Sequence, residues 1–273
     1  MNVYCTAADI QEGLGRSTTI SNAIALALAE AASRTIDGFT GRRFISETGT
    51  RYFDTGSAGD ILRIDDLLAL TTLKTDSEGD GTYDGESWTV NTDFWVKPES
   101  AYPKNWIELT AFGSYSFPRK VRRYVQISGI WGYGDGTASP WLVTAITGTV
   151  ATTGGLALTL SAAGTILAGQ TIKIGDEQLY VQAVTTADGL TTATIIRGVN
   201  GTTAATHNAG AISIALYPAD VKQAAILMAV AQWEYFGGQA RIQAVTMDSP
   251  IASAPRARGI AEAMLAGYKN FLV

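Results

Sequence analysis

The sequence holds one cysteine and one histidine in 273 residues, and this scarcity excludes several classes of site. The single cysteine, Cys5, cannot form an intrachain disulfide, so the disulfide framework of a small secreted protein is excluded. Zinc sites built from thiolates and imidazoles need several such ligands, and they are excluded for the same reason. A Ser-His-Asp triad would have to use His207.

His207 lies in a segment of threonine, alanine and glycine, residues 201–210, and the chain contains no nucleophile-elbow motif. We interpret His207 as a turn histidine that bonds its own loop, which makes a hydrolase the least favoured functional class. We therefore assign no catalytic, cofactor-binding or metal-binding residue from the sequence.

The chain also lacks an excess of positive charge. Its 25 acidic and 20 basic residues give a net charge of −5. This balance argues against tight sequence-independent binding of nucleic acid, which depends on Lys and Arg neutralising phosphates. It is compatible with a channel through which nucleic acid passes without sticking. Charged residues make up 16% and hydrophobic residues 46% of the chain. Such a composition suits a protein with subunit contacts, and a plain large domain explains it nearly as well.

Targeting and membrane signals are missing too. The first 15 residues do not show the basic-then-apolar pattern of a signal peptide. A membrane span needs roughly 20 apolar residues, and the most apolar stretch is interrupted by Gln223, Gln232 and Glu234. We therefore expect a soluble protein made in a reducing cytoplasm, with no membrane partner.

That apolar stretch is the clearest predicted helix. It begins at Pro218, which suits the first helical position. Asp220 lies in the first turn, where the partial positive charge of the helix N-terminus stabilises a carboxylate. Gly237 and Gly238 predict its end. Residues 224–231 are apolar on every face, whereas a helix lying on one surface shows a single apolar stripe. The helix must therefore be covered on several sides.

Three further helices are expected. Thr6 and Asp9 resemble a capping box that starts a short helix. A second helix, 19–38, has an alanine-rich stripe at steps of three and four residues. A loop over 239–255 precedes a last helix, 256–272.

We expect helices 19–38, 218–237 and 256–272 to form one bundle. The first and last would cover the apolar helix within the subunit. An adjacent subunit would cover the remainder, including Trp233, Tyr235 and Phe236.

Between residues 44 and 134 the pattern changes to short runs of β-branched and aromatic residues separated by turn clusters. No helical period interrupts them, so we expect an antiparallel or mixed sheet rather than a βαβ array. The expected strands are 50–54, 61–64, 69–75, 83–90, 94–96, 106–110 and 125–131.

Residues 141–216 differ in composition, with few charges and much Thr, Ala and Gly. They predict a small all-β module whose small aliphatic residues give a thin core, so that it packs against something else. Its charged residues are Lys173, Asp176, Glu177, Asp188 and Arg197. Its expected strands are 157–160, 171–174, 178–184, 193–196 and 211–216.

Together these patterns predict an α+β fold. A helical bundle drawn from both chain ends would pack with a small antiparallel or mixed β-sheet. The predicted domains are a core of residues 1–140 and 217–273 and an inserted β domain of residues 141–216, placed at a surface loop where insertions are tolerated.

Asp76 to Gly81 resembles the start of a calcium loop, with oxygen ligands at alternate positions and glycine at the sixth. However, the twelfth position is Ser87, where a bidentate glutamate is required, and the flanks are strands. A hairpin turn is the favoured interpretation, and cation binding at Asp76 and Asp80 stays open.

Two further charged clusters stand out. Asp65 and Asp66 are interpreted as solvated or helix-capping residues rather than an acid–base pair, because nothing nearby separates their pKa values. Residues 119–123, together with Arg42 and Arg43, form the densest basic feature. It could touch phosphate, but we favour a solvated or inter-subunit role in a chain that is acidic overall.

A set of short motifs along the chain carries a family resemblance. They are residues 4–10, 36–44, 67–76 with 79–81, Trp88, 92–94, Pro98, 125–134 and 218–225, and, in the insertion, 174–181 and 197–207. Through the first set the chain resembles the phage head–tail connector, or adaptor, proteins over residues 1–140 and 217–273. In that family the Gly-Tyr-Gly strand end leads almost directly into the Pro-initiated helix, whereas here roughly 80 residues intervene. The inserted segment resembles a small β segment of other phage structural proteins.

The resemblance implies a structural virion protein that is not an enzyme and has no cofactor. It implies a homo-oligomeric ring, typically a dodecamer, at the head–tail junction of the virion, made in a bacterial host cytoplasm. Its partners would be the portal protein on one side and a tail-proximal or stopper protein on the other. DNA would pass through the lumen without sequence-specific binding, helped by an acidic ring.

Two alternatives stay open. One is another phage tail or baseplate structural protein. The other is a carbohydrate-binding or adhesive β-module protein, which the Thr- and Gly-rich insertion and the six tryptophans motivate.

Overall fold

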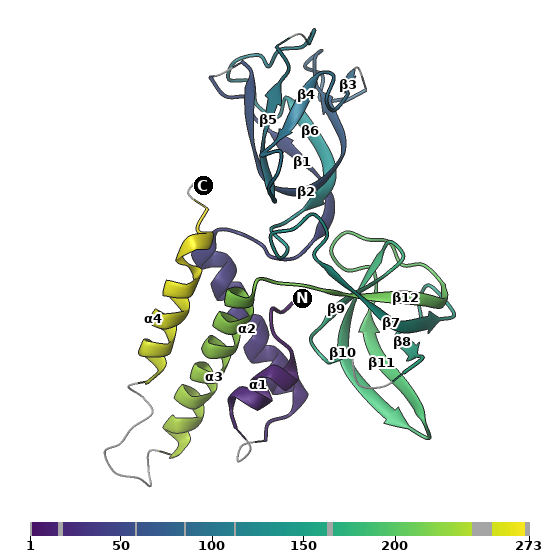
Figure 1. The fold of residues 1–273 in the computed structure, drawn as a ribbon, viewed down its shortest axis with the longest axis vertical. Coiled ribbons are helices and arrows are strands. Elements are labelled where there is room, and N and C mark those ends of the chain that lie inside the picture. The colour runs from purple at the N-terminus through teal and green to yellow at the C-terminus, as the bar shows by residue number, and fades with distance from the viewer. Residues whose placement is uncertain are drawn as a thin grey trace. The chain divides into compact units, whose positions relative to one another are not determined.

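The chain divides into two compact units (Figure 1). Unit 1 combines Met1–Arg42 with Trp141–Val273, and unit 2 is Arg43–Pro140. The computed structural model describes all residues except 1, 16–18, 58, 85, 112, 163–165, 242–252 and 271–273. The domains expected from the sequence group the chain differently and stay a prediction.

The first two helices of unit 1 begin at polar caps. In α1 (Ala7–Gly13), the Asp9 amide donates to Thr6 Oγ1 at 3.1 Å, and the Thr6 amide donates to Asp9 Oδ2 at 2.8 Å. The predicted capping box is therefore confirmed. Ser21 caps α2 (Asn22–Thr40), which ends at Gly41 with the left-handed φ of 65° that glycine adopts most readily.

Helix α3 (Ala219–Arg241) runs through Gly237 and Gly238, so the expected end at these glycines is wrong. A glycine costs a helix only about 1 kcal/mol, and the residues that follow, Gln-Ala-Arg, favour helix. Helix α4 (Ser253–Leu265) begins earlier than expected and continues into the 3₁₀ turn η2 (Ala266–Tyr268). The centre of the predicted loop, 242–252, lies outside the described residues.

Within unit 1, α2, α3 and α4 lie alongside one another (Figure 1). The inward face of α3 is fully buried at Val221, Ala224, Ala225 and Ala229. Small side chains on this face allow a close approach between helices.

The remainder of unit 1 is a closed barrel with strand order β10-β11-β8-β7-β12-β9. Every pairing within it is antiparallel. The strands are β7 (Trp141–Val150), β8 (Ala157–Leu160), β9 (Thr171–Ile174), β10 (Glu177–Ala187), β11 (Leu190–Ile196) and β12 (His207–Ala215). Strands β8 and β9 match their predicted bounds, whereas β7 has no counterpart among the expected strands.

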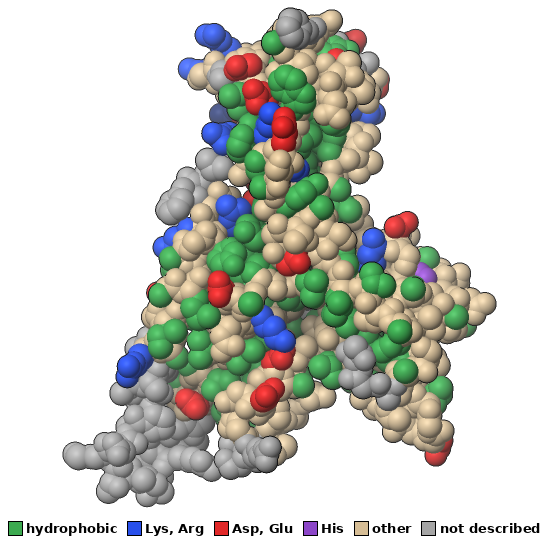
Figure 2. All heavy atoms as spheres, viewed as in Figure 1, with side chains coloured by type: hydrophobic (Ala, Val, Ile, Leu, Met, Phe, Trp, Pro, Cys, Tyr) green, Lys and Arg blue, Asp and Glu red, His purple; other side chains and the backbone are tan. Residues whose placement is uncertain are grey.

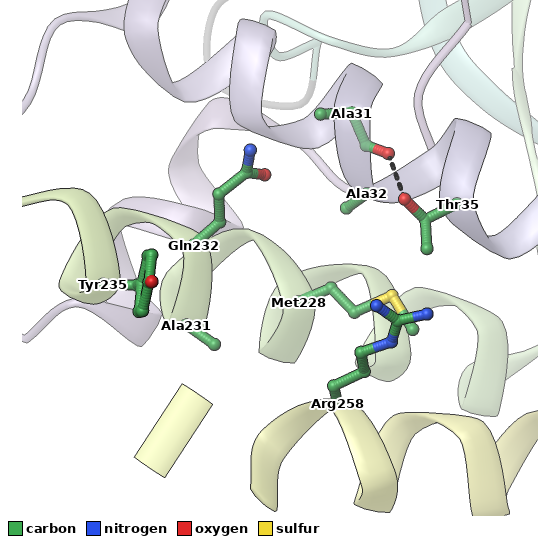
Figure 3. A pocket seen from close by; sticks show the side chains of 8 residues that line it. All are labelled: Ala31, Ala32, Thr35, Met228, Ala231, Gln232, Tyr235 and Arg258. Atoms are coloured by element: carbon green, nitrogen blue, oxygen red, sulfur yellow. Dashed lines mark hydrogen bonds between the residues drawn. The ribbon is translucent and has the colours of Figure 1, made fainter. Parts of the chain in front are cut away.

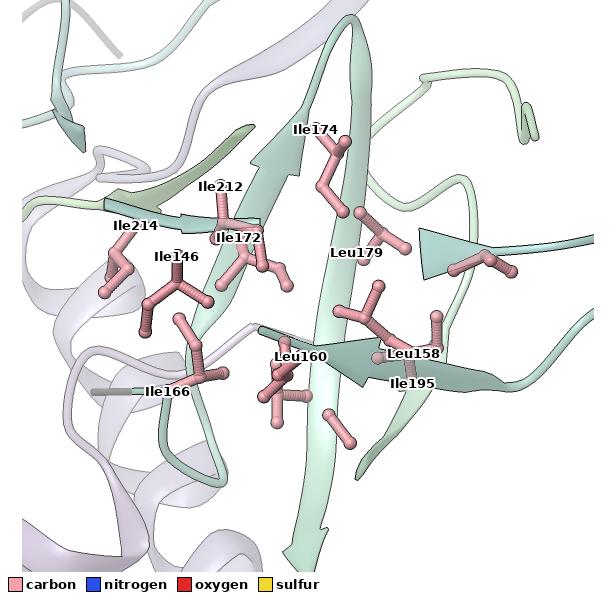
Figure 4. Close-up of a cluster of buried hydrophobic side chains, with 13 residues drawn as sticks. Ile146, Leu158, Leu160, Ile166, Ile172, Ile174, Leu179, Ile195, Ile212 and Ile214 are labelled. Atoms are coloured by element: carbon pink, nitrogen blue, oxygen red, sulfur yellow. The ribbon is translucent and has the colours of Figure 1, made fainter. Parts of the chain in front are cut away.

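Large aliphatic side chains fill the barrel (Figure 4). Leu158, Ile172, Leu179 and Ile212 are completely buried. The expected thin core is therefore wrong. The alternation of each strand directs isoleucines and leucines inward, while threonines such as Thr159, Thr185 and Thr194 face outward. Figure 2 accordingly shows the barrel surface as mostly uncharged side chains.

The barrel is joined to the N-terminal segment by hydrogen bonds. The Ala7 amide donates to the Ala168 carbonyl at 3.1 Å. Thr171 Oγ1 donates to Asn2 Oδ1 at 2.8 Å, and Asn2 Nδ2 donates to Asn200 Oδ1 at 2.5 Å. Asn2 and Thr171 are buried, so these bonds fix the chain start against the barrel.

Unit 2 is an antiparallel sheet with strand order β1-β6-β2-β5-β4, and β3 pairs with β2. This arrangement confirms the expected antiparallel or mixed pairing of 44–134. Its core is centred on completely buried Trp131, Phe94, Leu67 and Ile127. The strands are β1 (Glu47–Phe53), β2 (Ile61–Thr75), β3 (Glu86–Trp88), β4 (Phe94–Lys97), β5 (Lys104–Leu109) and β6 (Val125–Trp131).

Strand β2 replaces the two strands expected at 61–64 and 69–75. It pairs with β5 through its first half and with β6 through its second, with shifts of register between them. Asp65 and Asp66 interrupt the apolar alternation at the change of partner, which is why the sequence suggested a break. Since both lie within a strand, neither caps a helix. Asp65 is exposed, which confirms the solvated alternative for it, whereas Asp66 is buried. Asp65 instead accepts from Arg51 at 2.8 Å.

The predicted fold class is wrong. Strands account for 36% of the chain and helices for 23%, so the fold is mostly β and is not built around a helical bundle from the two chain ends. The main reason for the difference is the closed barrel, whose six strands pair with one another to form a complete β structure. Among the described residues, no helix is long and apolar enough to cross a membrane.

Candidate functional site

The histidine that any catalytic triad would need is engaged elsewhere. His207 begins β12, and its Nε2 lies 2.8 Å from Glu177 Oε2 at the start of β10. The prediction that it bonds its own loop is therefore wrong, because its partner is 30 residues away in sequence. The imidazole contacts a buried carboxylate rather than a nucleophile.

Glu177 is 1% exposed and accepts several hydrogen bonds. Arg197 donates to both carboxylate oxygens, each at 2.6 Å. The amides of Gly198 and Ala205 add bonds of 3.1 and 3.0 Å. Burial raises the pKa of Glu177, but the bonds from Arg197, Ala205, His207 and Gly198 outweigh it and lower the pKa from 4.5 to about 2. The carboxyl group is therefore ionised at neutral pH.

This cluster connects separate parts of the barrel. Arg197 Nη1 also donates to the carbonyls of Thr152 and Gly155, at 3.0 and 3.2 Å, in the turn between β7 and β8. The segment between β11 and β12 is thus held both to the start of β10 and to the turn between β7 and β8. A fully bonded buried carboxylate is suited to fixing a structure, and we assign the cluster a structural role.

The thiol is no better placed for nucleophilic chemistry. Cys5 is 3% exposed. Burial, with a smaller contribution from Asp9, raises its pKa to about 12. The thiolate is the reactive form of cysteine, and at neutral pH Cys5 is a protonated thiol. We therefore interpret Cys5 as a residue of the buried core.

The segment that resembles a calcium loop forms the turn between β2 and β3, as the favoured interpretation predicted. The Asp76 carboxylate accepts from the amides of Gly79, Asp80 and Gly81 at 2.9, 3.2 and 3.1 Å. Asp80 Oδ1 accepts from the Thr82 amide at 2.9 Å. Both carboxylates therefore stabilise the turn itself. No group of three His, Cys, Asp or Glu side chains is placed to hold a metal ion in the described part of the chain.

The basic residues fall into different surroundings. Arg42 Nε donates to the Tyr268 carbonyl at 2.7 Å, and Arg43 lies 3.5 Å from Glu47. Residues 119–123 are exposed in the connection between β5 and β6. Both interpretations of these residues, contact with phosphate and a solvated or inter-subunit role, stay predictions.

A concave site lies between the helices of unit 1 (Figure 3). We call it the helical groove, and its volume is about 250 Å³. Helix α2 provides small side chains, and α3 provides Met228 and Tyr235 together with Ala231 and Gln232. Arg258 of α4 also lines the groove, with its Nε 2.8 Å from Glu262. The lining residues are Ala31, Ala32, Thr35, Met228, Ala231, Gln232, Tyr235 and Arg258.

Apolar surface continues beyond the helical groove. Ile24 is 43% exposed and lies two turns before Ala31 on the same face of α2. Tyr235, at the other side of the groove, is 38% exposed. Figure 2 shows hydrophobic side chains at the surface over these helices, with charged ones interspersed among them. Such a surface is suited to contact with another protein.

Sequence reasoning indicated part of this surface. The all-round apolar run of α3 predicted cover from two helices, and α2 and α4 do pack against it. The groove itself depends on how far α2 and α4 stand apart, which side-chain periodicity does not give. Of the aromatic residues assigned to an adjacent subunit, Trp233 is half-buried and Tyr235 is exposed, while the side chain of Phe236 lies outside the description.

Comparison of the chain with protein-family models and with curated proteins finds no match.

Proposed function

We propose that this protein is a structural component of a phage particle, a head–tail connector that assembles into a homo-oligomeric ring. The observation that carries the proposal is the helical groove, an apolar site on an exposed side of α2, α3 and α4. The sequence resemblance over residues 4–10, 125–134 and 218–225 supplies the class of particle.

The occupant that we propose for the helical groove is a second copy of this chain. A groove on one subunit filled by a different surface of the next is a heterologous contact, and repeating such a contact by rotation closes a ring. The low content of charged residues, 16%, also favours a surface used in assembly.

In this proposal the ring is a dodecamer at the head–tail junction, bound to the portal on one side and to a tail-proximal or stopper protein on the other. DNA passes through its lumen. A net charge of −5 per subunit weakens general adhesion of the polyanion to the wall.

The buried chemistry supports a structural role over an enzymatic one. Glu177, Arg197 and His207 are bonded to each other, and Cys5 is buried with a raised pKa. These side chains fix the fold and leave no activated nucleophile among them.

The test is to image a phage that lacks this protein. We expect heads that fill with DNA but leak it and do not join tails. Normal joined particles would refute the connector, and joined particles with defective tips would favour the tail or baseplate alternative.

Complementation sharpens the experiment. Supplying the chain with Ala31→Arg, which places a long cation in the helical groove, should leave heads and tails unjoined. Ala263→Arg on the exposed side of α4, outside the groove, should restore joining and serves as the matched control.

A further inference from the structure

The connection between β5 and β6 presents a concentrated positive surface. We call residues 119–123 the basic loop: Arg119, Lys120, Val121, Arg122 and Arg123, all exposed. The ion pairs described in unit 2 use other cations, namely Arg43, Arg51 and Lys97. The basic loop therefore presents its charges outward without acidic partners among the described residues.

The loop backbone is held firmly to the segment that follows β1. The Thr55 amide donates to the Val121 carbonyl at 2.9 Å, and the Val121 amide donates to Thr55 Oγ1 at 2.9 Å. The Lys120 amide donates to the Gly56 carbonyl at 3.0 Å, and the Arg123 amide donates to Asp54 Oδ1 at 2.8 Å. Its cations are thus displayed from a fixed base.

Two of the cationic residues adopt left-handed backbone angles. The φ angles of Lys120 and Arg123 are 58° and 50°. Glycine or asparagine would adopt this region at less cost. The sequence instead keeps two long cations there, which is the kind of local strain that accompanies binding sites.

Aromatic rings lie beside the basic loop. The Arg123 guanidinium lies 4.5 Å from the centre of the Tyr52 ring, and the rings of Tyr52 and Tyr83 are 5.3 Å apart. Tyr83 also donates its hydroxyl to the Arg123 carbonyl. Arg123 is anchored by these contacts, which leaves Arg119, Lys120 and Arg122 for an external anion.

We propose that the basic loop binds the phosphate backbone of duplex DNA. Duplex DNA offers about one negative charge per 1.7 Å of its axis, so three neighbouring cations meet phosphates in any register along it. An acidic protein surface would need carboxylates at matched positions. The choice of duplex DNA as the polyanion rests on the proposed function.

A small number of contacts makes this binding weak and sensitive to salt. Three phosphates predict a slope of about −2.7 for log binding constant against log salt concentration. The binding constant should therefore fall about 40-fold between about 50 and about 200 mM salt. Such a contact restrains DNA near the loop and still releases it readily.

The experiment measures fluorescence anisotropy of a short labelled DNA duplex with the full chain across this salt range. Replacing two arginines, R119Q with R122Q, should make the slope shallower by about 1.8. The matched control, R43Q with R63Q, removes two exposed arginines of the same unit and should leave the slope unchanged. Circular dichroism melting checks that each variant is folded.

Three results would overturn the proposal: no salt-dependent binding by the unaltered chain, equal losses in both double variants, or equal displacement by polyglutamate of matched charge. The last result would indicate that the partner of the basic loop is an acidic protein surface rather than DNA. If the protein is a monomer that binds duplex DNA through the basic loop, the proposed ring is contradicted and this inference stands. If the protein forms a ring that does not bind duplex DNA, this inference is contradicted and the proposed ring stands.

Discussion

At the scale of single residues, Glu177 is a buried charge that connects separate parts of the barrel. Its carboxylate joins the start of β10 to Arg197, His207 and two backbone amides. Removing one partner of a buried ion pair leaves the other charge uncompensated in a poorly solvated site. The cost is therefore larger than that of losing an exposed ion pair.

Glu177→Gln should destabilise unit 1 by about 3–5 kcal/mol. The reason is that Arg197, whose side chain is only 6% exposed, would be left without its carboxylate. Hydrogen exchange of the β10 and β12 amides measures the loss locally. Asp176→Asn, at the neighbouring fully exposed position, should change stability by less than about 0.5 kcal/mol. Similar protection in both variants would contradict the assignment.

The same carboxylate gives a pH dependence. Because its pKa is lowered in the folded protein to about 2 from 4.5, its contribution to stability is complete above pH 4.5 and is lost as the pH falls toward about 2. Urea unfolding followed across this range should show the free energy of unfolding decreasing with acid. Glu177→Gln should lack this part of the decrease, and an unchanged acid profile in that variant would exclude Glu177 as its source.

The sequence indicated these three residues individually, but not that their side chains meet. Glu177, Arg197 and His207 all lie in segments that carry the resemblance of the insertion to other phage proteins. Their meeting could not be predicted, since it depends on barrel closure bringing the starts of β10 and β12 together. The available signal was the presence of Glu177 and Arg197 among only five charged residues in the segment 141–216.

At the scale of elements, Gly132 limits how β6 can end. Its φ is 126°, and a Cβ there would lie 1.8 Å from the Ile45 carbonyl oxygen. The close approach explains a glycine at this point of the Gly-Tyr-Gly segment. It also fixes the start of β1 relative to the end of β6.

Gly132→Ala should destabilise unit 2 by more than about 2 kcal/mol, because the backbone must move to admit a methyl group. Denaturant unfolding followed by tryptophan fluorescence measures this. Gly49→Ala, where a Cβ meets nothing within 4 Å, should be neutral or stabilising by up to about 1 kcal/mol. The same sign for both substitutions would show that the contact with Ile45 is not limiting.

Element types were predictable where periodicity was strong. β6, β8 and β9 match the expected bounds, and α2 is a helix as expected. Its predicted stripe is wrong, because Ala23, Ile24, Ala27 and Thr35 are exposed. The face that packs inward is instead Ala25, Ala29, Ala32, Ser33, Ile36 and Thr40. β7 was missed because its first half, Trp141 to Ala145, is exposed and shows no inward alternation. The end of α3 was misplaced because two glycines weaken a helix without stopping it.

At the scale of the whole molecule, closure of the barrel could not be predicted from its strands. Closure of the six strands requires pairings between strands far apart in the chain, above all β7 with β12. The strand content, 36% against 23% helix, makes the fold mostly β rather than helix-centred. The helical groove could not be predicted either, since it depends on the distances between the packed helices α2, α3 and α4.

The helical groove carries the prediction for assembly. Ala31→Arg should shift the protein toward monomers, with association weakened by about tenfold or more, because an unpaired cation would enter an apolar contact. Sedimentation velocity over a concentration series measures the shift. Ala263→Arg should assemble as the unaltered chain does, and equal behaviour of the two variants would place the subunit contact elsewhere.

The most direct test of the central claim is the native mass of the purified 273-residue chain, measured by mass photometry together with native mass spectrometry. A ring-forming connector should give a closed assembly whose mass is a multiple of the 28.8 kDa chain, with a dodecamer as the expected species. A stable 28.8 kDa monomer at all concentrations, particularly one with affinity for glycans, would contradict it.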